Sequence, residues 1–164
     1  MPHEYVSSVQ LGFAGLFLST SPIHASPPES LFDAAQHVHT DEITVRWGDM
    51  DAGGHVKNSR FFTDFEEAQV GWLKATLDES LFMASGPVLA EASCDFERLP
   101  PATLAIDVYA TPPGRSSLKS TYDATLADTG ARVANGMAVL VWVDLVWVDA
   151  ETGEPVPVPD LGLR

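Results

Sequence analysis

The chain has few cysteines and few basic residues, and both shortages exclude classes of function. Cys94 is the single cysteine in 164 residues, so neither an intrachain disulfide nor a cysteine-rich zinc site can form. A lone thiol is typical of a reducing compartment, and we expect a cytoplasmic protein. Lysine and arginine number 9 against 23 aspartates and glutamates, for a formal charge of −14. Nucleic acids and anionic membrane surfaces bind clustered basic residues, so we expect neither as a partner.

A long apolar run is also missing. The apolar stretch at residues 9–18 is far shorter than the roughly 20 residues of a membrane-spanning helix. No basic residue precedes Arg46, so the positive segment of a secretory signal is lacking. We expect residues 1–39 to be a mobile arm or an accidental extension, with a divergent signal or anchor as the alternative. Residues 40–164 then form one domain of ordinary globular composition.

The pattern of apolar residues predicts a strand, a long helix and then four strands. Residues 40–47 alternate apolar and polar side chains, which is the period of a half-buried strand. Spacings of three and four residues predict an amphipathic helix from Ser59 to Leu77, capped by Asn58 or Ser59. The later strands are expected at residues 88–98, 104–111, 116–126 and 132–148. Proline and glycine breaks between them favour an antiparallel meander covered by the helix, an α+β fold.

A short repeat occurs in the last predicted strand. The segment VWVD at residues 141–144 returns at residues 146–149. Because the offset is odd, Trp142 and Trp147 face opposite sides of a continuous strand. We favour a local duplication that lengthens a hairpin, and the alternative is an exposed apolar strip used in self-association.

Groups that can carry chemistry gather before the predicted helix, in the stretch DMDAGGHVKN at residues 49–58. The sequence has no glycine-rich nucleotide loop, nucleophile elbow or paired cysteines. A carboxylate beside a helix N-terminus can act as a base or nucleophile while free amides hold an oxyanion. The alternative is that Asp49 and Asp51 only accept hydrogen bonds from the amides of a turn.

The stretch VRWGDMDAGGHVKNSRFFTDFEEAQVGWL resembles the opening motif of hotdog-fold acyl-CoA thioesterases of the 4-hydroxybenzoyl-CoA thioesterase type. DFERL, GRSSLKSTYD and VWVDAETGEPVPVPD resemble the later strands and tail of that family, so the similarity covers roughly residues 40 to 160. The resemblance implies a hotdog fold, in which an antiparallel sheet wraps one long helix. It also implies dimers or tetramers with active sites at subunit boundaries, and Asp51 as the catalytic carboxylate.

This resemblance predicts hydrolysis of an acyl-CoA thioester with no metal or other cofactor. Asp51 would attack the carbonyl or deprotonate water, and amides at Asn58 and Ser59 would hold the oxyanion. The family usually has Asn where this chain has Lys57, and we expect a carboxylate or a bound phosphate to compensate that charge. The residues expected to bind the substrate are His55, Lys57, Arg60, Phe61, Arg115 and Ser116.

Other interpretations remain. The main alternative is a non-catalytic hotdog module that binds acyl-CoA as a sensor or assembly part, and a weaker one is a hotdog dehydratase or hydratase. Glu66 and Glu67 are further carboxylate candidates, although a solvated helix face is the simpler interpretation. His37 and His39 would share one face of an extended strand, like half of a metal site, but we expect no metal there. Cys94 is expected to serve packing.

Overall fold

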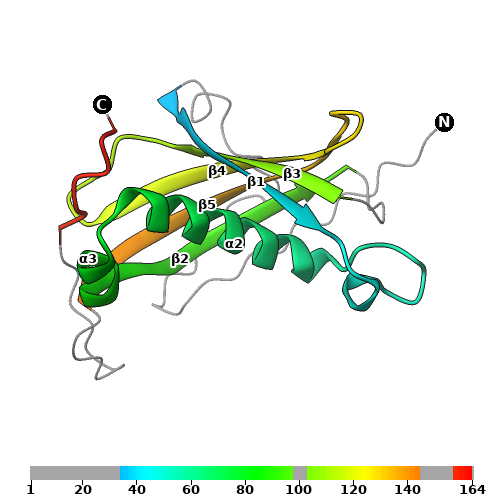
Figure 1. The fold of residues 1–164 in the computed structure, drawn as a ribbon, viewed down its shortest axis with the longest axis horizontal. Coiled ribbons are helices and arrows are strands. Elements are labelled where there is room, and N and C mark those ends of the chain that lie inside the picture. Colours follow the sequence, from blue (N-terminus) through cyan, green and yellow to red (C-terminus); the bar gives the residue numbers. More distant parts are fainter. Residues whose placement is uncertain (1–33, 98–102, 145–156, 164) are drawn as a thin grey trace, which may run out of the picture.

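The structure is a computed structural model that describes residues 34–97, 103–144 and 157–163. Residues 1–33 of the predicted arm and the second copy of the repeated segment, residues 146–149, lie outside the described residues. Figure 1 shows one long helix lying across one face of an antiparallel sheet, which confirms the α+β prediction. Among the described residues, no helix has the length and hydropathy needed to cross a membrane.

Five strands form one sheet in the order β1-β3-β4-β5-β2. They are β1 (Gln36–Thr44), β2 (Ser85–Phe96), β3 (Thr103–Ala110), β4 (Ser117–Leu126) and β5 (Arg132–Asp144). The consecutive strands β3, β4 and β5 pair as neighbours, as predicted. The simple meander is wrong for β2, which pairs with β5 at the far edge of the sheet. Proline and glycine mark where a strand ends, but they do not say which strand it pairs with.

The long helix α2 (Asn58–Thr76) agrees with the prediction to one residue at each end. The predicted cap is wrong, because the N-cap is Lys57 and its side chain makes no capping hydrogen bond. A short helix, α3 (Glu79–Ala84), follows α2 and was not predicted, since six residues are too few for a clear helical period. The first strand also ends earlier than expected: a 3₁₀ turn, η1 (Trp47–Asp49), begins where alternation had predicted a half-buried Trp47, which is 93% exposed.

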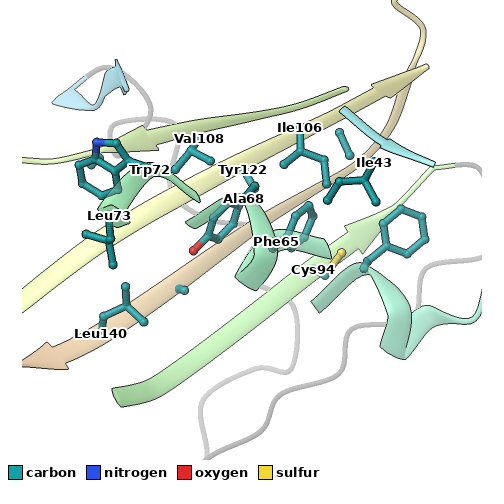
Figure 2. Close-up of a cluster of buried hydrophobic side chains, with 14 of the residues drawn as sticks. Ile43, Phe65, Ala68, Trp72, Leu73, Cys94, Ile106, Val108, Tyr122 and Leu140 are labelled. Carbon is teal, nitrogen blue, oxygen red and sulfur yellow. The ribbon is translucent and has the colours of Figure 1, made fainter. Parts of the chain in front are cut away.

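The core lies between α2 and the face of the sheet that α2 covers. Figure 2 shows labelled core side chains from both layers, among them Phe65 of α2 and Tyr122 of β4. Their rings stack with centroids 4.7 Å apart. A Cβ atom at Gly136 would lie 2.5 Å from the Phe65 ring, so this position in β5 requires glycine. Cys94 is buried in this core, and burial raises the pKa of its thiol, as expected for a packing residue.

The sheet begins earlier than the predicted domain boundary. Residues 36–39, which the sequence assigned to the arm, belong to β1 and pair with β3. A register shift between His37 and His39 places them opposite neighbouring residues of β3, so the expected shared face is wrong. The His37 Nε2 atom lies 3.2 Å from Asp107 Oδ1, whereas His39 lies beside Gly71 of α2.

The described C-terminal residues, 157–163, return to the same core. The Val158 N–H donates to the Arg115 carbonyl oxygen at 3.0 Å, and Leu161 is buried. Trp142, in the first copy of the repeated segment, is fully buried, and its Nε1 donates to Ser85 Oγ at 3.0 Å. The C-terminal segment and the first VWVD copy are therefore both part of the domain.

Candidate active site

The two aspartates of the predicted site lie in a tight turn that precedes α2. Met50 and Val56 form an antiparallel bridge, and the Asp51 N–H donates to the His55 carbonyl oxygen at 2.7 Å. Gly54 has a φ of 78°, which favours glycine. In Figure 1 this turn, in cyan, projects beyond the N-terminal end of α2. The backbone thus holds Asp51 in a defined place near the first turn of the helix.

The Asp51 carboxylate is exposed, and one of its oxygens is held by the turn. Oδ1 accepts the N–H groups of Gly53 at 2.8 Å and His55 at 3.0 Å. The hydrogen bond from His55 is the main cause that lowers the Asp51 pKa below its ordinary value, so the group is ionised at neutral pH. Asp51 therefore bonds the turn and, as an exposed carboxylate, stays accessible to a ligand.

Asp49, two residues earlier, has a different environment. Its Oδ2 accepts the Arg46 N–H at 2.8 Å, and its Oδ1 lies 3.6 Å from Arg60 Nε. Its carbonyl oxygen accepts the Lys57 N–H at 2.9 Å. The side chain is only 14% exposed. Asp49 therefore ties the turn to the start of α2 and is less accessible than Asp51.

Lys57 has a partner of a kind that the sequence did not predict. Its Nζ donates to the Gly48 carbonyl oxygen at 2.9 Å, so a backbone group takes the place of the expected carboxylate, and the bound phosphate stays a prediction. The partial negative charge of this carbonyl oxygen partly offsets the unfavourable position of a cation at the positive end of the helix dipole. Asn58 and Ser59, expected as oxyanion donors, form the first turn of α2, where the backbone N–H groups precede the regular intrahelical hydrogen bonds.

Arg60 belongs to an internal ion-pair network that sequence reasoning missed. Its Nε lies 2.7 Å from Oδ1 of Asp64, whose side chain is 1% exposed, and its Nη2 lies 3.7 Å from Glu67. Burial raises the pKa of Asp64 to about 6, although the nearby Arg60 charge lowers it. The available signal was the spacing of four residues between Arg60 and Asp64 on one helix face.

Three residues expected to bind substrate are buried or lie at the far end of the sheet from Asp51. Phe61 is completely buried and contacts Phe96 in the core, with ring centroids 5.4 Å apart, so it presents no surface to a ligand. Arg115 and Ser116 follow β3 at its Ala110 end, whereas the aspartate turn follows β1 at the opposite end of the sheet. Eight residues of extended strand separate these ends by about 26 Å. One chain by itself therefore does not bring Arg115 and Ser116 to Asp51.

A cavity of about 220 Å³ lies between α2 and the strands β2 and β5. Its lining is mostly apolar, with polar groups from Thr63, Glu66 and Gln69 of α2 and from Tyr122 of β4. Glu66 thus lies at this cavity, while Glu67 lies on the Arg60 side of the helix. Sequence reasoning gave Gln69 no role in a site, because a single glutamine in a helix carries no recognisable functional signal.

The described part of the chain contains no group of three or more histidine, cysteine, aspartate or glutamate side chains placed to hold a metal ion. His37 pairs with Asp107 and Thr40 through side-chain hydrogen bonds instead. His55, expected at the substrate, is exposed in the turn, and its backbone N–H and carbonyl both bond Asp51. The chemistry available at the turn is that of a carboxylate, a helix N-terminus and an imidazole.

The comparisons with known proteins agree on one family. The profile of the thioesterase-like superfamily matches residues 45–161. The PA2801 protein from Pseudomonas aeruginosa is 35% identical with a TM-score of 0.67, and the match covers 76% of this chain and 95% of that one. A thioesterase from Thermus thermophilus, complexed with coenzyme A and Zn, is 27% identical with a TM-score of 0.62, covering 77% and 94%.

A third structure, Slr0204, a 1,4-dihydroxy-2-naphthoyl-CoA thioesterase from Synechocystis, shares the fold at 21% identity and a TM-score of 0.62, covering 73% of this chain and 89% of that one. No curated protein matches. The narrower 4-hydroxybenzoyl-CoA type stays a prediction. The family match runs from the residues before the aspartate turn to the C-terminal segment, and the similar structures share one long helix on an antiparallel sheet. This chain therefore has the hotdog fold and belongs to the thioesterase-like superfamily.

Proposed function

We propose that the protein hydrolyses an acyl-CoA thioester to the free acid and CoA, with Asp51 as the catalytic carboxylate. The observation that carries the proposal is the Asp51 side chain itself. Backbone amides hold its Oδ1, and the carboxylate stays exposed in the turn that precedes α2. Family membership supports thioester hydrolysis in general, and the relative complexed with coenzyme A supports a CoA ester as substrate.

Two routes use this geometry. In the first, Asp51 Oδ2 attacks the thioester carbonyl, CoA leaves as the thiolate, and water hydrolyses the resulting acyl anhydride. In the second, Asp51 takes a proton from water, and the hydroxide attacks the carbonyl. In both, negative charge develops on the carbonyl oxygen, where the first-turn N–H groups at Asn58 and Ser59 and the helix dipole stabilise it.

We propose further that the complete site lies between two copies of the chain. β2 is an edge strand of the sheet, and its Val88 and Leu89 are 49% and 48% exposed. Antiparallel pairing of two β2 edges extends the sheet and brings the side chains of the partner's strand beside these residues. Such pairing places opposite ends of the two sheets side by side. The Arg115 end of one protomer then lies near the Asp51 end of its partner, where Arg115 and Ser116 can contact the CoA phosphates.

The test is a thiol-release assay over a panel of acyl-CoA esters with three matched variants. Asp51→Asn should lower turnover at least about 100-fold, because an amide is neither a base nor a nucleophile at this position. Glu67→Gln is the control, since that exposed carboxylate belongs neither to the aspartate turn nor to the lining of the cavity. Loss of activity in Glu66→Gln, with Asp51→Asn fully active, would move the catalytic carboxylate to the cavity.

The binding module stays as the second candidate, because the exposed first turn of α2 and the cavity suit binding as well as hydrolysis. Calorimetry with acyl-CoA separates the two functions. Micromolar binding without any thiol release from the parent protein would establish the module and reject the enzyme.

A further inference from the structure

Gln69 is a buried polar residue at the wall of the cavity. It is 4% exposed on the core side of α2, and Tyr122 beside it is 3% exposed. The Tyr122 hydroxyl donates to Gln69 Oε1 at 2.7 Å. The Gln69 Nε2 atom is buried and has no hydrogen-bond partner among the residues that the structure describes.

An unpartnered buried amide is unusual in a native protein, since nearly all buried polar groups are hydrogen-bonded. Tyr122 stays protonated because burial raises its phenol pKa, so it remains a donor toward Oε1. Exchange of the amide oxygen and nitrogen of Gln69 would still leave a donor unpaired, because the pair has three donor hydrogens and makes one internal bond. The pair therefore presents at least one free donor for an oxygen acceptor that comes from outside the chain.

The cavity has the size and the lining of an acyl site. Its volume of about 220 Å³ exceeds the roughly 150 Å³ that holds a benzene molecule in an engineered apolar cavity. Leu89, Leu140 and Phe62 supply apolar walls. The acidic side chain of Glu66 also lines it, so an anionic substituent on the ligand would be repelled.

The distance along α2 between Gln69 and the proposed thioester site matches the length of an acyl chain. The lining residues of the helix run from Phe62 to Val70, about 12 Å of helix at the usual rise per residue. The cavity begins about one turn after Ser59 and reaches Gln69 near its other end. An acyl group whose carbonyl lies at the first-turn amides would thus meet Gln69 with its distal part.

We propose that this cavity is the acyl pocket and that Gln69 selects acyl groups with a neutral oxygen, a hydroxyl or keto group, remote from the thioester carbon. The inference rests on the proposed thioesterase function. A site that hydrogen-bonds a substrate oxygen discriminates against the analogue without it, because the buried donor is then left unpaired. One such bond should change the ratio of kcat/KM values by about tenfold.

The experiment compares pairs of acyl-CoA esters from hexanoyl to dodecanoyl, each with and without a terminal hydroxyl group. The parent protein should prefer the hydroxylated ester by about tenfold in kcat/KM at the chain length that fits. The double variant Gln69→Met/Tyr122→Phe removes both polar partners and keeps similar volumes, so it should fold and lose the preference while it still hydrolyses the plain ester. Tyr122→Phe alone keeps the amide and should retain the preference.

Three outcomes separate this inference from the function on which it rests. Equal kcat/KM values for both esters in the parent protein at every chain length would overturn the inference and leave the thioesterase intact, since Gln69 then bonds only water. An unchanged preference in the double variant would also overturn it. If the parent releases no thiol but calorimetry shows about tenfold tighter binding of the hydroxylated ester, lost in the double variant, the pocket assignment holds and the hydrolytic function fails.

Discussion

The Nε atom of Arg60 lies 2.7 Å from Oδ1 of Asp64, a carboxylate buried one turn further along α2. The same guanidinium lies 3.6 Å from Asp49 Oδ1 in the aspartate turn. Arg60 therefore links a buried acid of the helix to the turn that holds Asp51. This role explains why a residue that the sequence suggested for substrate binding faces the protein interior.

Removing Arg60 should destabilise the protein strongly. Arg60→Ala leaves Asp64 buried without its partner, and such a change costs about 3 kcal/mol in the free energy of unfolding. Chemical denaturation measures the loss. The double variant Arg60→Leu/Asp64→Leu should recover much of it, because it removes both charges. A double variant as unstable as Arg60→Ala would show that the contact with Asp49 matters more.

The buried acid should also make stability depend on pH in a definite direction. The folded-state pKa of Asp64 is raised to about 6 by burial, so the folded protein holds a proton that the unfolded chain has already released. The contribution of Asp64 is therefore greatest at acid pH and is lost as pH rises from about 4 to about 6. The expected size is about 2 to 3 kcal/mol.

Asp64→Asn isolates this contribution from other carboxylates. The difference in unfolding free energy between the parent and this variant should change across the window between about pH 4 and pH 6 and be flat above it. Denaturation curves at several pH values provide the measurement. A difference independent of pH would mean that Asp64 stays ionised throughout and that Arg60 outweighs burial.

The pH dependence of catalysis should differ from that of stability. Hydrogen bonds from the turn lower the pKa of Asp51, so its carboxylate stays ionised well below neutral pH. We expect kcat/KM to show no acid limb assignable to Asp51 above about pH 4.5. A limb near pH 6 that disappears in Asp64→Asn would instead assign the titration to the buried acid.

Gly136→Ala should damage the core under α2. The added methyl group would lie 2.5 Å from the Phe65 ring, which stacks on Tyr122 and has little room to move. Overpacking of this kind costs about 1 to 3 kcal/mol, measurable by thermal or chemical denaturation. Phe65→Leu in the same chain should relieve the clash. Gly48→Ala is the control, because nothing lies within 4 Å of the added atom.

The start of β1 sets a limit for truncation. Removal of residues 1–33 leaves every described element in place, and we expect the melting temperature and the thiol-release activity to be unchanged. Removal of residues 1–44 takes away β1 and the buried Ile43, leaves β3 without a partner on one side, and should abolish cooperative unfolding. A large loss of stability in the shorter truncation would show that the arm contributes to the fold.

The sequence by itself determined the local features of this protein. The spacing of apolar residues located α2 to within one residue, because an amphipathic helix repeats its pattern over several turns. The alternation in β3, β4 and β5 located three strands with their hairpin breaks. The aspartate turn was also visible, since Asp and Gly residues shape a turn through contacts with their own neighbours. The family resemblance added the functional hypothesis to these features.

Only the tertiary structure decided which distant residues meet. Strands that pair across long stretches of chain decide three features. These are the place of β2 at the far edge of the sheet, the register shift that separates His37 from His39, and the burial of Phe61. The polarity of Asp64 predicts exposure, but its position on α2 turns it toward the protein interior. Side-chain burial and strand pairing depend on how the helix and the sheet pack together. The segments that surround a side chain are distant in the sequence, so the local pattern of residues does not specify them.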